Sequence, residues 1–409
     1  MQTVTPEALA RALTALPDDP RVVVSGNHSV PWALVHLLDA TLETYTLNML
    51  NGPAGLPDRA GVTLETSFVG PGQRRRAGLR YVPSRLSLVP VLYRDRLPVD
   101  CVLVHCAPPR EGHLSLGLEV NLLPGAVEAC RERGGLVVAM VNDRMPYTHG
   151  DARVPLDHVD LAVEVSEPLP SPAAHAPLGE ETSAIGRRVA AMVPDGATLQ
   201  MGIGAVPDAA LAALTEHREL RLWTEMFSDG VLALDAAGAL DPDHPLTTSF
   251  LFGSPELYAW VDGNPRVQMA RTERTNDPGL IARQRSMTSI NTALQVDLFG
   301  QANASRLGAR IHSGFGGQTD FIVGALHSPG GQAFLALRSW HPRADVSTIV
   351  PLVDEPVTSF QATAIVTEQG TAPLFGHSER DQARALIEQA AHPRVREELW
   401  EEAAELGLA

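Results

Sequence analysis

The chain has 409 residues, with 32 basic and 48 acidic side chains and a formal net charge of −16. A hydrophobic fraction of 44% and a charged fraction of 20% are ordinary for a globular chain of two or three domains. The acidic balance argues against nucleic-acid binding and against anchoring on anionic membranes, because both need basic surfaces. It leaves room for a local basic pocket.

Every basic side chain in the sequence is an arginine, because the chain contains no lysine. A Schiff-base lysine, a pyridoxal-phosphate site and a Walker A loop all depend on a lysine, so these three site types are excluded. Any phosphate recognition by a positively charged side chain must therefore use arginine.

The first residues, MQTVTPEALARALTALPDD, lack the basic segment and apolar run of a signal peptide. Thr5, Pro6 and Glu7 instead predict the start of a helix. No stretch of about 18 apolar residues occurs in the sequence, so we expect no membrane span. We expect a cytoplasmic protein.

In the first half of the chain, short β-branched runs alternate with longer amphipathic segments, which is typical of α/β units around parallel sheets. A helix is predicted over residues 124–133, ending at Gly134 and Gly135. The predicted strands cover residues 21–24, 99–104, 136–141 and 159–165.

Three cysteines, Cys101, Cys106 and Cys130, show no CxxC spacing, so a disulfide framework or zinc site is not expected. We interpret them as reduced and buried. His105 beside Cys106 is compatible with a thiol nucleophile, but the pair lies in an apolar run that predicts a strand.

Residues 166–181 contain four prolines and several small residues, and their composition predicts a linker. We therefore expect an N-terminal α/β domain over residues 1–170 and a C-terminal α/β domain over residues 182–409. In the second domain we predict helices over 185–192 and 208–217, a strand ending near Gln200 and a strand over 220–224.

The segment 202–207 follows a predicted strand and opens a helix, with Gly202 and Gly204 but Pro207 in place of a third glycine. It is half of a dinucleotide fingerprint, so a Rossmann cofactor site is disfavoured. Small residues at a helix start let backbone N–H groups approach an anion or a developing oxyanion. A tight structural turn is the alternative.

A second glycine-rich loop spans residues 314–317, where three glycines permit backbone conformations that other residues avoid. A ligand lying against the main chain would use such a loop, and a purely structural role is the alternative. Neither glycine loop alone identifies a ligand.

Two glutamates follow predicted strands at their carboxyl ends, the edge where open α/β sheets bind ligands. Glu225 follows Thr224, and Glu368 follows Thr367. In both places a predicted strand is followed by a threonine and then by the glutamate. A solvated charge is the ordinary role of one such glutamate, whereas two in the same arrangement indicate a site.

Several motifs together resemble the acetyl-CoA hydrolase/4-hydroxybutyrate CoA-transferase group of family I CoA-transferases. They are TSFVGPGQRRRAGLRYVPS, VLVHCAPPREGHLSLGLEVN, VNDRMPYTHGD, MGIGAVPDAALAAL, LRLWTEMFSDGV, TSFLFGSPELYAWVDGNP, INTALQVDLFGQAN, HSGFGGQTDFI and IVTEQG. The resemblance covers nearly the whole chain in the expected order.

This resemblance implies an α/β fold with two open domains and an active site in the cleft between them. It makes Glu225 the nucleophile and places Glu368 near the acyl carboxylate. It assigns the turn Gly202, Ile203, Gly204, Ala205 and Val206 to coenzyme A and the oxyanion, and Asn291, Gly314, Gly316 and Gly317 to coenzyme A. Arg338, after a predicted strand over 333–337, is the expected phosphate-binding residue.

The implied activity is transfer of CoA between short-chain acyl-CoA and a carboxylate through a glutamyl-CoA thioester. It requires no metal and no permanently bound cofactor, since coenzyme A is a substrate, and the family suggests a homo-oligomer. Hydrolysis of acyl-CoA by the same glutamate is the first alternative and non-catalytic acyl-CoA binding the second; a dehydrogenase is more distant. Tyr147 and residues 369–374 depart from the family pattern and leave the acid specificity open.

Overall fold

The structure is a computed structural model that describes residues 1–172, 178–202 and 204–409. These residues form two compact units, each built from three segments of the chain. Unit 1 comprises Met1–Ala173, Leu246–Thr275 and His312–Gly316. Unit 2 comprises Ala174–Pro245, Asn276–Ile311 and Gly317–Ala409. Residues 173–177 of the predicted linker lie outside the described part.

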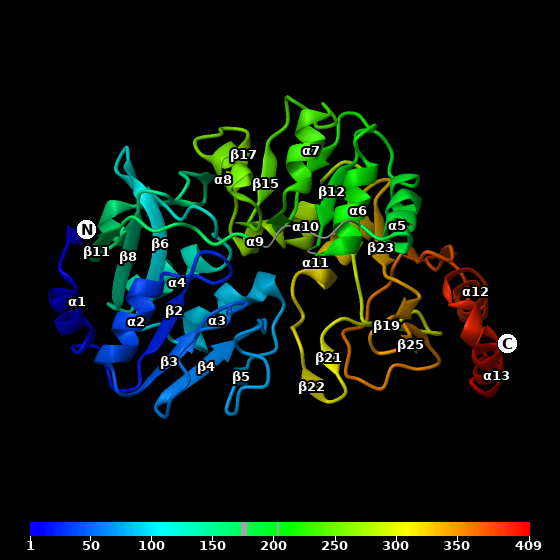
Figure 1. Cartoon of the computed structure of the whole chain (residues 1–409), viewed down its shortest axis with the longest axis horizontal. Coiled ribbons are helices and arrows are strands. Elements are labelled where there is room, and N and C mark those ends of the chain that lie inside the picture. Colours follow the sequence, from blue (N-terminus) through cyan, green and yellow to red (C-terminus); the bar gives the residue numbers. More distant parts are fainter. Residues whose placement is uncertain (173–177, 203) are drawn as a thin grey trace. The chain divides into compact units, whose positions relative to one another are not determined.

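Unit 1 is organised around a parallel sheet with the strand order β1-β11-β8-β6-β2-β3-β4-β5 (Figure 1). The central strands are continuous β-branched runs buried on both faces, the usual pattern of a parallel sheet. The strands of unit 1 are β1 (Gln2–Thr3), β2 (Arg21–Val24), β3 (Tyr45–Asn48), β4 (Val62–Thr66), β5 (Arg80–Tyr81), β6 (Cys101–Arg110), β7 (His113–Ser115), β8 (Leu136–Asn142), β9 (His149–Gly150), β10 (Arg153–Pro155), β11 (Leu161–Val165), β15 (Leu246–Thr248), β16 (Phe250–Leu251) and β17 (Val267–Met269).

The helices of unit 1 bury their apolar faces against this sheet. Leu9 and Leu13 of the first helix and Leu34 and Leu38 of the second pack with Val22 in one core, and each fully buried side chain contributes about 2 kcal/mol. As predicted, the Thr5 hydroxyl caps the first helix by accepting the N–H of Ala8 at 3.4 Å. The helices are α1 (Pro6–Leu13), α2 (Trp32–Thr41), η1 (Leu86–Leu88), α3 (Val89–Asp95), α4 (Leu123–Glu132), η2 (Leu156–His158), α8 (Pro255–Val261) and α9 (Thr272–Thr275).

Unit 2 contains a second sheet, with the order β13-β12-β18-β23-β27-β28 and parallel pairing except between the last two strands. The carboxyl ends of its parallel strands therefore meet at one edge. The strands of unit 2 are β12 (Thr198–Met201), β13 (Arg221–Leu222), β14 (Met226–Phe227), β18 (Thr288–Asn291), β19 (Gln295–Asp297), β20 (Ala302–Asn303), β21 (Arg306–Leu307), β22 (Arg310–Ile311), β23 (Gln332–Ala336), β24 (Trp340–His341), β25 (Val346–Ser347), β26 (Ile349–Val350), β27 (Ala364–Val366) and β28 (Thr371–Pro373).

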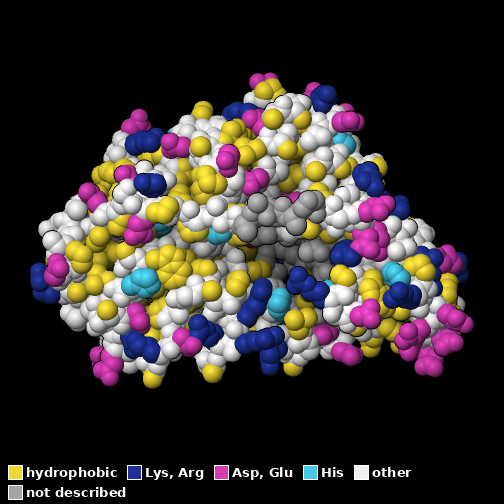
Figure 2. Space-filling model, viewed as in Figure 1, with side chains coloured by type: hydrophobic (Ala, Val, Ile, Leu, Met, Phe, Trp, Pro, Cys, Tyr) yellow, Lys and Arg dark blue, Asp and Glu magenta, His cyan; other side chains and the backbone are white. Residues whose placement is uncertain are grey.

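The core of unit 2 joins the sheet to helices from the C-terminal third of the chain. Phe321 and Ile322 pack with Leu335, Leu386 and Leu399 in this core. Figure 2 shows acidic side chains gathered where the last two helices lie. The helices of unit 2 are α5 (Glu180–Ala190), α6 (Ala205–Ala213), α7 (Gly230–Ala236), α10 (Pro278–Ile281), α11 (Gln318–His327), α12 (Glu379–Ala385), η3 (Leu386–Ala390), η4 (Pro393–Val395) and α13 (Arg396–Glu405).

The predicted α/β class is confirmed, and the predicted elements exist with shifted ends. The sequence predicts a strand over 220–224, but the observed strand, β13 (Arg221–Leu222), is shorter. The chain turns at Thr224 and Glu225 and ends the strand before them. The helix expected over 208–217 begins at Ala205, directly after Gly204. Cys101, Cys106 and Cys130 are free and buried, as expected, and burial raises the pKa of the Cys130 thiol to about 12.

Candidate active site

Glu225 lies in the turn between β13 and β14 of unit 2, past the carboxyl end of the first of these strands. The preceding residue, Thr224, is fully buried. Its hydroxyl accepts the N–H of Met201 at 3.2 Å and lies 3.2 Å from the carbonyl oxygens of Met201 and Met226. The turn that carries Glu225 is thereby fixed to the end of the neighbouring strand β12.

The carboxylate of Glu225 is held by an amide group and enclosed by a glycine. Asn276 Nδ2 donates a hydrogen bond to Glu225 Oε2 at 2.9 Å. A Cβ placed on Gly317 would lie 2.3 Å from the same oxygen and 2.2 Å from Asn276 Nδ2. Real Cβ atoms do not approach that closely, so any other residue at this position would displace the Glu225 and Asn276 side chains.

Burial raises the pKa of Glu225 from 4.5 to about 7, although the hydrogen bond from Asn276 lowers it. The nearby carboxylate of Asp320, in the first turn of α11, raises it further by charge repulsion. A carboxylate whose pKa lies near neutrality combines an ionised fraction with more nucleophilic character than a solvated one. The group therefore has the electrostatics of a reactive carboxylate.

The glycine turn of unit 2 begins directly beside this site. Gly202 follows Met201, whose N–H is bound by the hydroxyl of Thr224. Gly204 stands at the start of α6 with φ of 126°, a conformation that side-chain-bearing residues rarely adopt. The expected residue Ile203 lies outside the described residues. Backbone N–H groups at this helix start are oriented to favour an anion.

Asn291, at the end of β18, belongs to a buried network of side-chain amides. Its Nδ2 donates to Gln200 Oε1 at 3.0 Å and to Ser289 Oγ at 2.8 Å. Ser289 Oγ donates to the same oxygen of Gln200 at 2.7 Å. The network joins the ends of β12 and β18, which are adjacent parallel strands.

A cavity of about 360 Å³ in unit 2 brings together two of the expected coenzyme A residues, Val206 and Arg338. Its remaining lining includes Trp340, His341 and Arg343, which sequence reasoning did not single out. Arg338 forms an ion pair with Glu181 of α5. The cavity thus combines apolar surface with positive charge, which suits a nucleotide or pantetheine group.

Glu368 belongs to a different cluster from Glu225. Ser339 donates its backbone N–H to Glu368 Oε2 at 2.9 Å and its hydroxyl to Oε1, and Gln369 Nε2 donates to Oε1 at 3.1 Å. Burial raises the pKa of Glu368, but these hydrogen bonds outweigh it and place the pKa below its usual value. The group is ionised at neutral pH and orders the segment after β23.

The loop predicted over residues 314–317 divides between the two units. Gly314 and Gly316 belong to unit 1, whereas Gly317 belongs to unit 2 and opens α11. Gly314 pairs with Phe68 in an antiparallel bridge. A Cβ on Gly314 would lie 2.6 Å from the Ser67 carbonyl oxygen, so close backbone packing requires this glycine.

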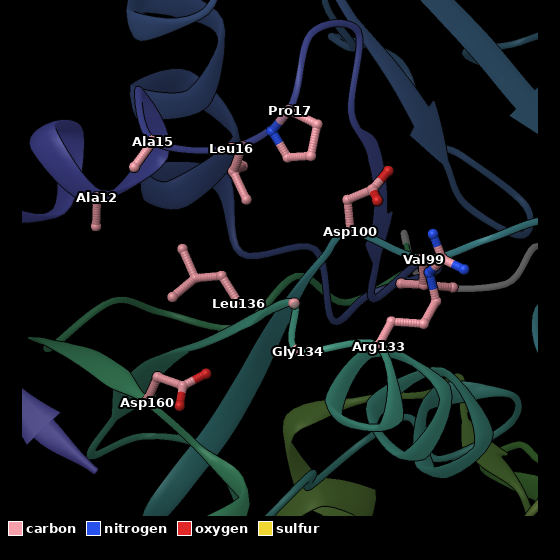
Figure 3. Close-up of a pocket in the computed structure, with 11 residues that line it drawn as sticks. Ala12, Ala15, Leu16, Pro17, Val99, Asp100, Arg133, Gly134, Leu136 and Asp160 are labelled. Carbon is pink, nitrogen blue, oxygen red and sulfur yellow. The ribbon is translucent and has the colours of Figure 1, made fainter.

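A cavity of about 610 Å³ in unit 1 lies at the edge of that unit's sheet where the parallel strands begin (Figure 3). Figure 3 shows the carboxylates of Asp100 and Asp160 and the guanidinium of Arg133 around it. Asp100 accepts the N–H of Arg21, and Asp160 accepts the N–H of Val137, both at 2.9 Å. Since the two aspartates directly precede β6 and β11, the cavity is at the amino edge, away from the ligand edge of α/β sheets.

The described residues provide neither a membrane-spanning helix nor a metal cluster. None of the described helices has the length and apolar character needed to cross a membrane. No group of three or more His, Cys, Asp or Glu side chains in the described ranges is arranged to hold a metal ion.

Comparison with known proteins gives the family. Residues 253–403 match the model of the acetyl-CoA hydrolase/transferase C-terminal domain. The chain is 40% identical to the 4-hydroxybutyrate coenzyme A transferase of Clostridium kluyveri over 79% of this chain and 76% of the relative. It is 34% identical to the succinyl-CoA:acetate/propanoyl-CoA:succinate CoA transferase of Fasciola hepatica over 94% of this chain and 84% of the relative.

Solved structures agree with this result. A 4-hydroxybutyrate CoA-transferase from Porphyromonas gingivalis matches with a TM-score of 0.83 and 30% identity over 99% of this chain and 98% of that one. RipA from Yersinia pestis matches with a TM-score of 0.91 and 27% identity over 100% of this chain and 98% of RipA. The chain belongs to the acetyl-CoA hydrolase/transferase family, and it is an enzyme of CoA-ester chemistry.

Proposed function

We propose that the protein is a CoA-transferase that moves CoA from a short-chain acyl-CoA to a free carboxylate of the acetate, butyrate or 4-hydroxybutyrate type. Glu225 is the nucleophile. The observation that carries this proposal is the Glu225 carboxylate, placed at a strand end, bound by Asn276 and given a pKa of about 7. The names of the relatives support the substrate class, since they include 4-hydroxybutyrate, succinate and butyrate CoA-transferases.

The reaction begins with attack of a Glu225 oxygen on the thioester carbonyl carbon. The carbon–sulfur bond breaks, CoA leaves as a thiolate, and an acyl-glutamyl anhydride remains. The thiolate then attacks the glutamyl carbonyl carbon and releases the donor acid, which leaves a glutamyl-CoA thioester. An incoming carboxylate attacks this thioester to give a new anhydride and CoA thiolate. Attack of the thiolate on its acyl carbonyl yields the new acyl-CoA and restores Glu225.

Each of these attacks passes through a tetrahedral oxyanion that needs hydrogen-bond donors. We assign this role to backbone N–H groups of the turn that contains Gly202 and Gly204, beside the Thr224 hydroxyl that fixes Met201. One such donor is typically worth about 3 kcal/mol of transition-state stabilisation. Because the donors belong to the backbone, glycine is required for close approach rather than for its own chemistry.

The other expected residues fit binding roles. Val206 and Arg338 line the 360 Å³ cavity, which we assign to part of coenzyme A. Asn291 and Gly314 remain predicted coenzyme A contacts, and Glu368 remains the predicted residue near the acyl carboxylate. A homo-oligomer, a cytoplasmic location and the lack of a permanently bound cofactor also stay predictions.

Hydrolysis is the second candidate function, because water can resolve the same anhydride or thioester. The relative named acetyl-CoA hydrolase in Kluyveromyces lactis is 33% identical over 48% of this chain and 38% of the relative. Non-catalytic acyl-CoA binding is the third candidate. It is less well supported, because binding alone does not use the reactive carboxylate of Glu225.

The test is to incubate the protein with butyryl-CoA, with and without acetate, and to measure acetyl-CoA and free CoA. The proposal predicts acetyl-CoA formation that depends on acetate, with little free CoA. Rapid CoA release that acetate does not divert would identify a hydrolase. Glu225→Gln should abolish both products, whereas Glu397→Gln, an exposed control on α13, should keep wild-type rates. Calorimetric binding of butyryl-CoA without turnover would support the binding protein.

A further inference from the structure

A run of three arginines, residues 74–76, follows β4 in unit 1. Because β4 is part of the parallel sheet, the loop after it lies at the carboxyl edge, where open α/β sheets bind ligands. We call residues 67–79 the arginine loop. The proposed chemistry of Glu225 does not use these three consecutive positive charges.

The arginine loop is held rigidly by the buried side chain of Gln73, which is 0% exposed. Its Oε1 accepts the N–H groups of Gly52 at 3.1 Å and Gly70 at 2.8 Å, and its Nε2 donates to the Met49 carbonyl at 3.0 Å. A Cβ on Gly72 would lie 1.7 Å from the carbonyl oxygen of Pro53. The loop is therefore packed against residues 49–53 and presents the arginines from a fixed base.

The three arginines differ in their partners. Arg76 forms an ion pair with Asp58 and donates to the Gly72 carbonyl at 3.1 Å. Arg74 and Arg75 are exposed, and no carboxylate in the described part of the chain forms an ion pair with either. Arg75 has φ of 61°, an uncommon backbone conformation for a residue with a side chain.

His312 lies beside these two arginines. Arg74 Nε donates to the backbone carbonyl of His312 at 2.9 Å. Burial, and then the positive charges of Arg74 and Arg75, lower the pKa of His312. Both guanidinium groups therefore act on this ring, so the two arginines form a positive surface beside an uncharged imidazole.

The arginine loop is joined through its backbone to the glycine loop that the family resemblance associates with coenzyme A. Val69 donates its N–H to Ser313 at 2.7 Å, and Phe68 pairs with Gly314. Leu86 donates its N–H to Gly316 at 3.1 Å. The arginine loop and residues 312–316 thus form one assembly within unit 1.

We propose that Arg74 and Arg75, with His312 beside them, form a binding site for a phosphate group of the CoA ester. This inference rests on the proposed function and adds a phosphate subsite in unit 1. A guanidinium can bind two phosphate oxygens at once, and arginine is the only such cation in this lysine-free chain. A protein of net charge −16 repels a polyanionic substrate, so a local positive surface is needed to attract it.

The test measures KM and kcat of Arg74→Gln and Arg75→Gln with butyryl-CoA, butyryl-dephospho-CoA and butyryl-pantetheine. Arg11→Gln, which removes one charge from the exposed face of α1, is the matched control. We expect each variant to raise KM for butyryl-CoA at least about tenfold, with kcat changed by less than about twofold. The wild-type KM should also rise with salt, and less steeply in the variants.

The substrate analogues identify the phosphate. Loss of the variant effect with butyryl-dephospho-CoA assigns the 3′-phosphate, whereas an effect that persists there and disappears with butyryl-pantetheine assigns the diphosphate. The proposal is overturned if both variants keep the wild-type KM for butyryl-CoA. It is also overturned if the variants raise KM for butyryl-pantetheine as much as they raise KM for butyryl-CoA. Arg75→Gln serves if Arg74→Gln unfolds, because the Arg75 side chain makes no hydrogen bond to any residue within 1–172, 178–202 and 204–409. Failure of the proposed function is separate, because the wild type would then form no acetate-dependent product from any of the three substrates.

Discussion

Gly317 leaves the space that the Glu225 carboxylate occupies: a Cβ at this glycine would lie 2.3 Å from Oε2. Gly317 has φ of −96°, which any residue adopts, so the constraint is space and not backbone conformation. Its substitution therefore tests the position of the nucleophile without straining the main chain.

We expect Gly317→Ala to lower kcat at least about a hundredfold, because misplacement of a reacting group by about 1 Å costs that much. Steady-state kinetics with butyryl-CoA and acetate measure the loss. Gly179→Ala is the control, since a Cβ there meets nothing within 4 Å and φ is −66°. Wild-type kcat in folded Gly317→Ala would contradict the assignment of Glu225 as nucleophile.

The pKa of Glu225 predicts a rising limb in the pH profile of kcat/KM near pH 7, since the nucleophile must be ionised. Asn276→Ala removes a hydrogen bond that lowers this pKa, so the limb should move to higher pH. Asp320→Asn removes a repelling negative charge, so the limb should move to lower pH. Shifts of the same sign in both variants would show that the limb reports another group.

The network around Asn291 predicts a loss of stability. Asn291→Ala leaves Gln200 Oε1 and Ser289 Oγ with one fewer partner each in a buried site. We expect the free energy of unfolding to fall by about 1–3 kcal/mol, measured by urea denaturation. A variant as stable as the wild type would show that the amide network carries little energy.

A buried carboxylate in unit 1 predicts a pH dependence of stability. Glu119 accepts the N–H of Gly26 at 3.2 Å and Nδ2 of Asn27 at 2.9 Å, yet burial raises its pKa to about 7. Because the folded state holds this proton more tightly than the unfolded state, the stabilisation is complete below about pH 4.5. It is lost as the pH rises through 7.

Between about pH 4.5 and pH 7 the free energy of unfolding of the wild type should fall by roughly 3 kcal/mol more than that of Glu119→Gln, because the glutamine cannot ionise. Urea denaturation at pH 4.5, 6 and 8 provides the comparison. Glu225 shifts stability in the same direction in both proteins, so only the difference between them reports Glu119. Parallel stability curves for the two proteins would contradict the raised pKa.

The sequence predicted the fold class and the principal strands because their signal is local. Short runs rich in β-branched residues, such as residues 21–24 and 136–141, are typical of central parallel strands, which they form. The glutamate after Thr224 and the glycines of residues 202–204 also carry local signals, namely strand ends and helix starts. Ends were less certain: β13 is shorter than expected because the Thr224 hydroxyl bonds the main chain and turns it.

The residues that tune the site were missed because they come from distant segments. Asn276 reaches Glu225 across 51 positions of sequence, and Asp320 acts on it from the first turn of α11. The hydrophobic periodicity of a sequence predicts helices and strands, but it does not show which distant residues contact one another. Two weak signals existed: Asn276 stands before an Asp-Pro helix start, and Asp320 follows the glycine-rich loop. Neither indicates which carboxylate the side chain faces.

The most direct test of the proposed chemistry is trapping of the covalent intermediate. The protein is incubated with butyryl-CoA and then with borohydride, which reduces a glutamyl thioester to an alcohol and releases CoA. Intact mass and peptide mapping should show a loss of about 14 Da, one oxygen replaced by two hydrogens, at Glu225 and nowhere else. Glu225→Ala should not change mass. Protein that turns over butyryl-CoA and yet never carries this change at Glu225 would contradict the proposed mechanism.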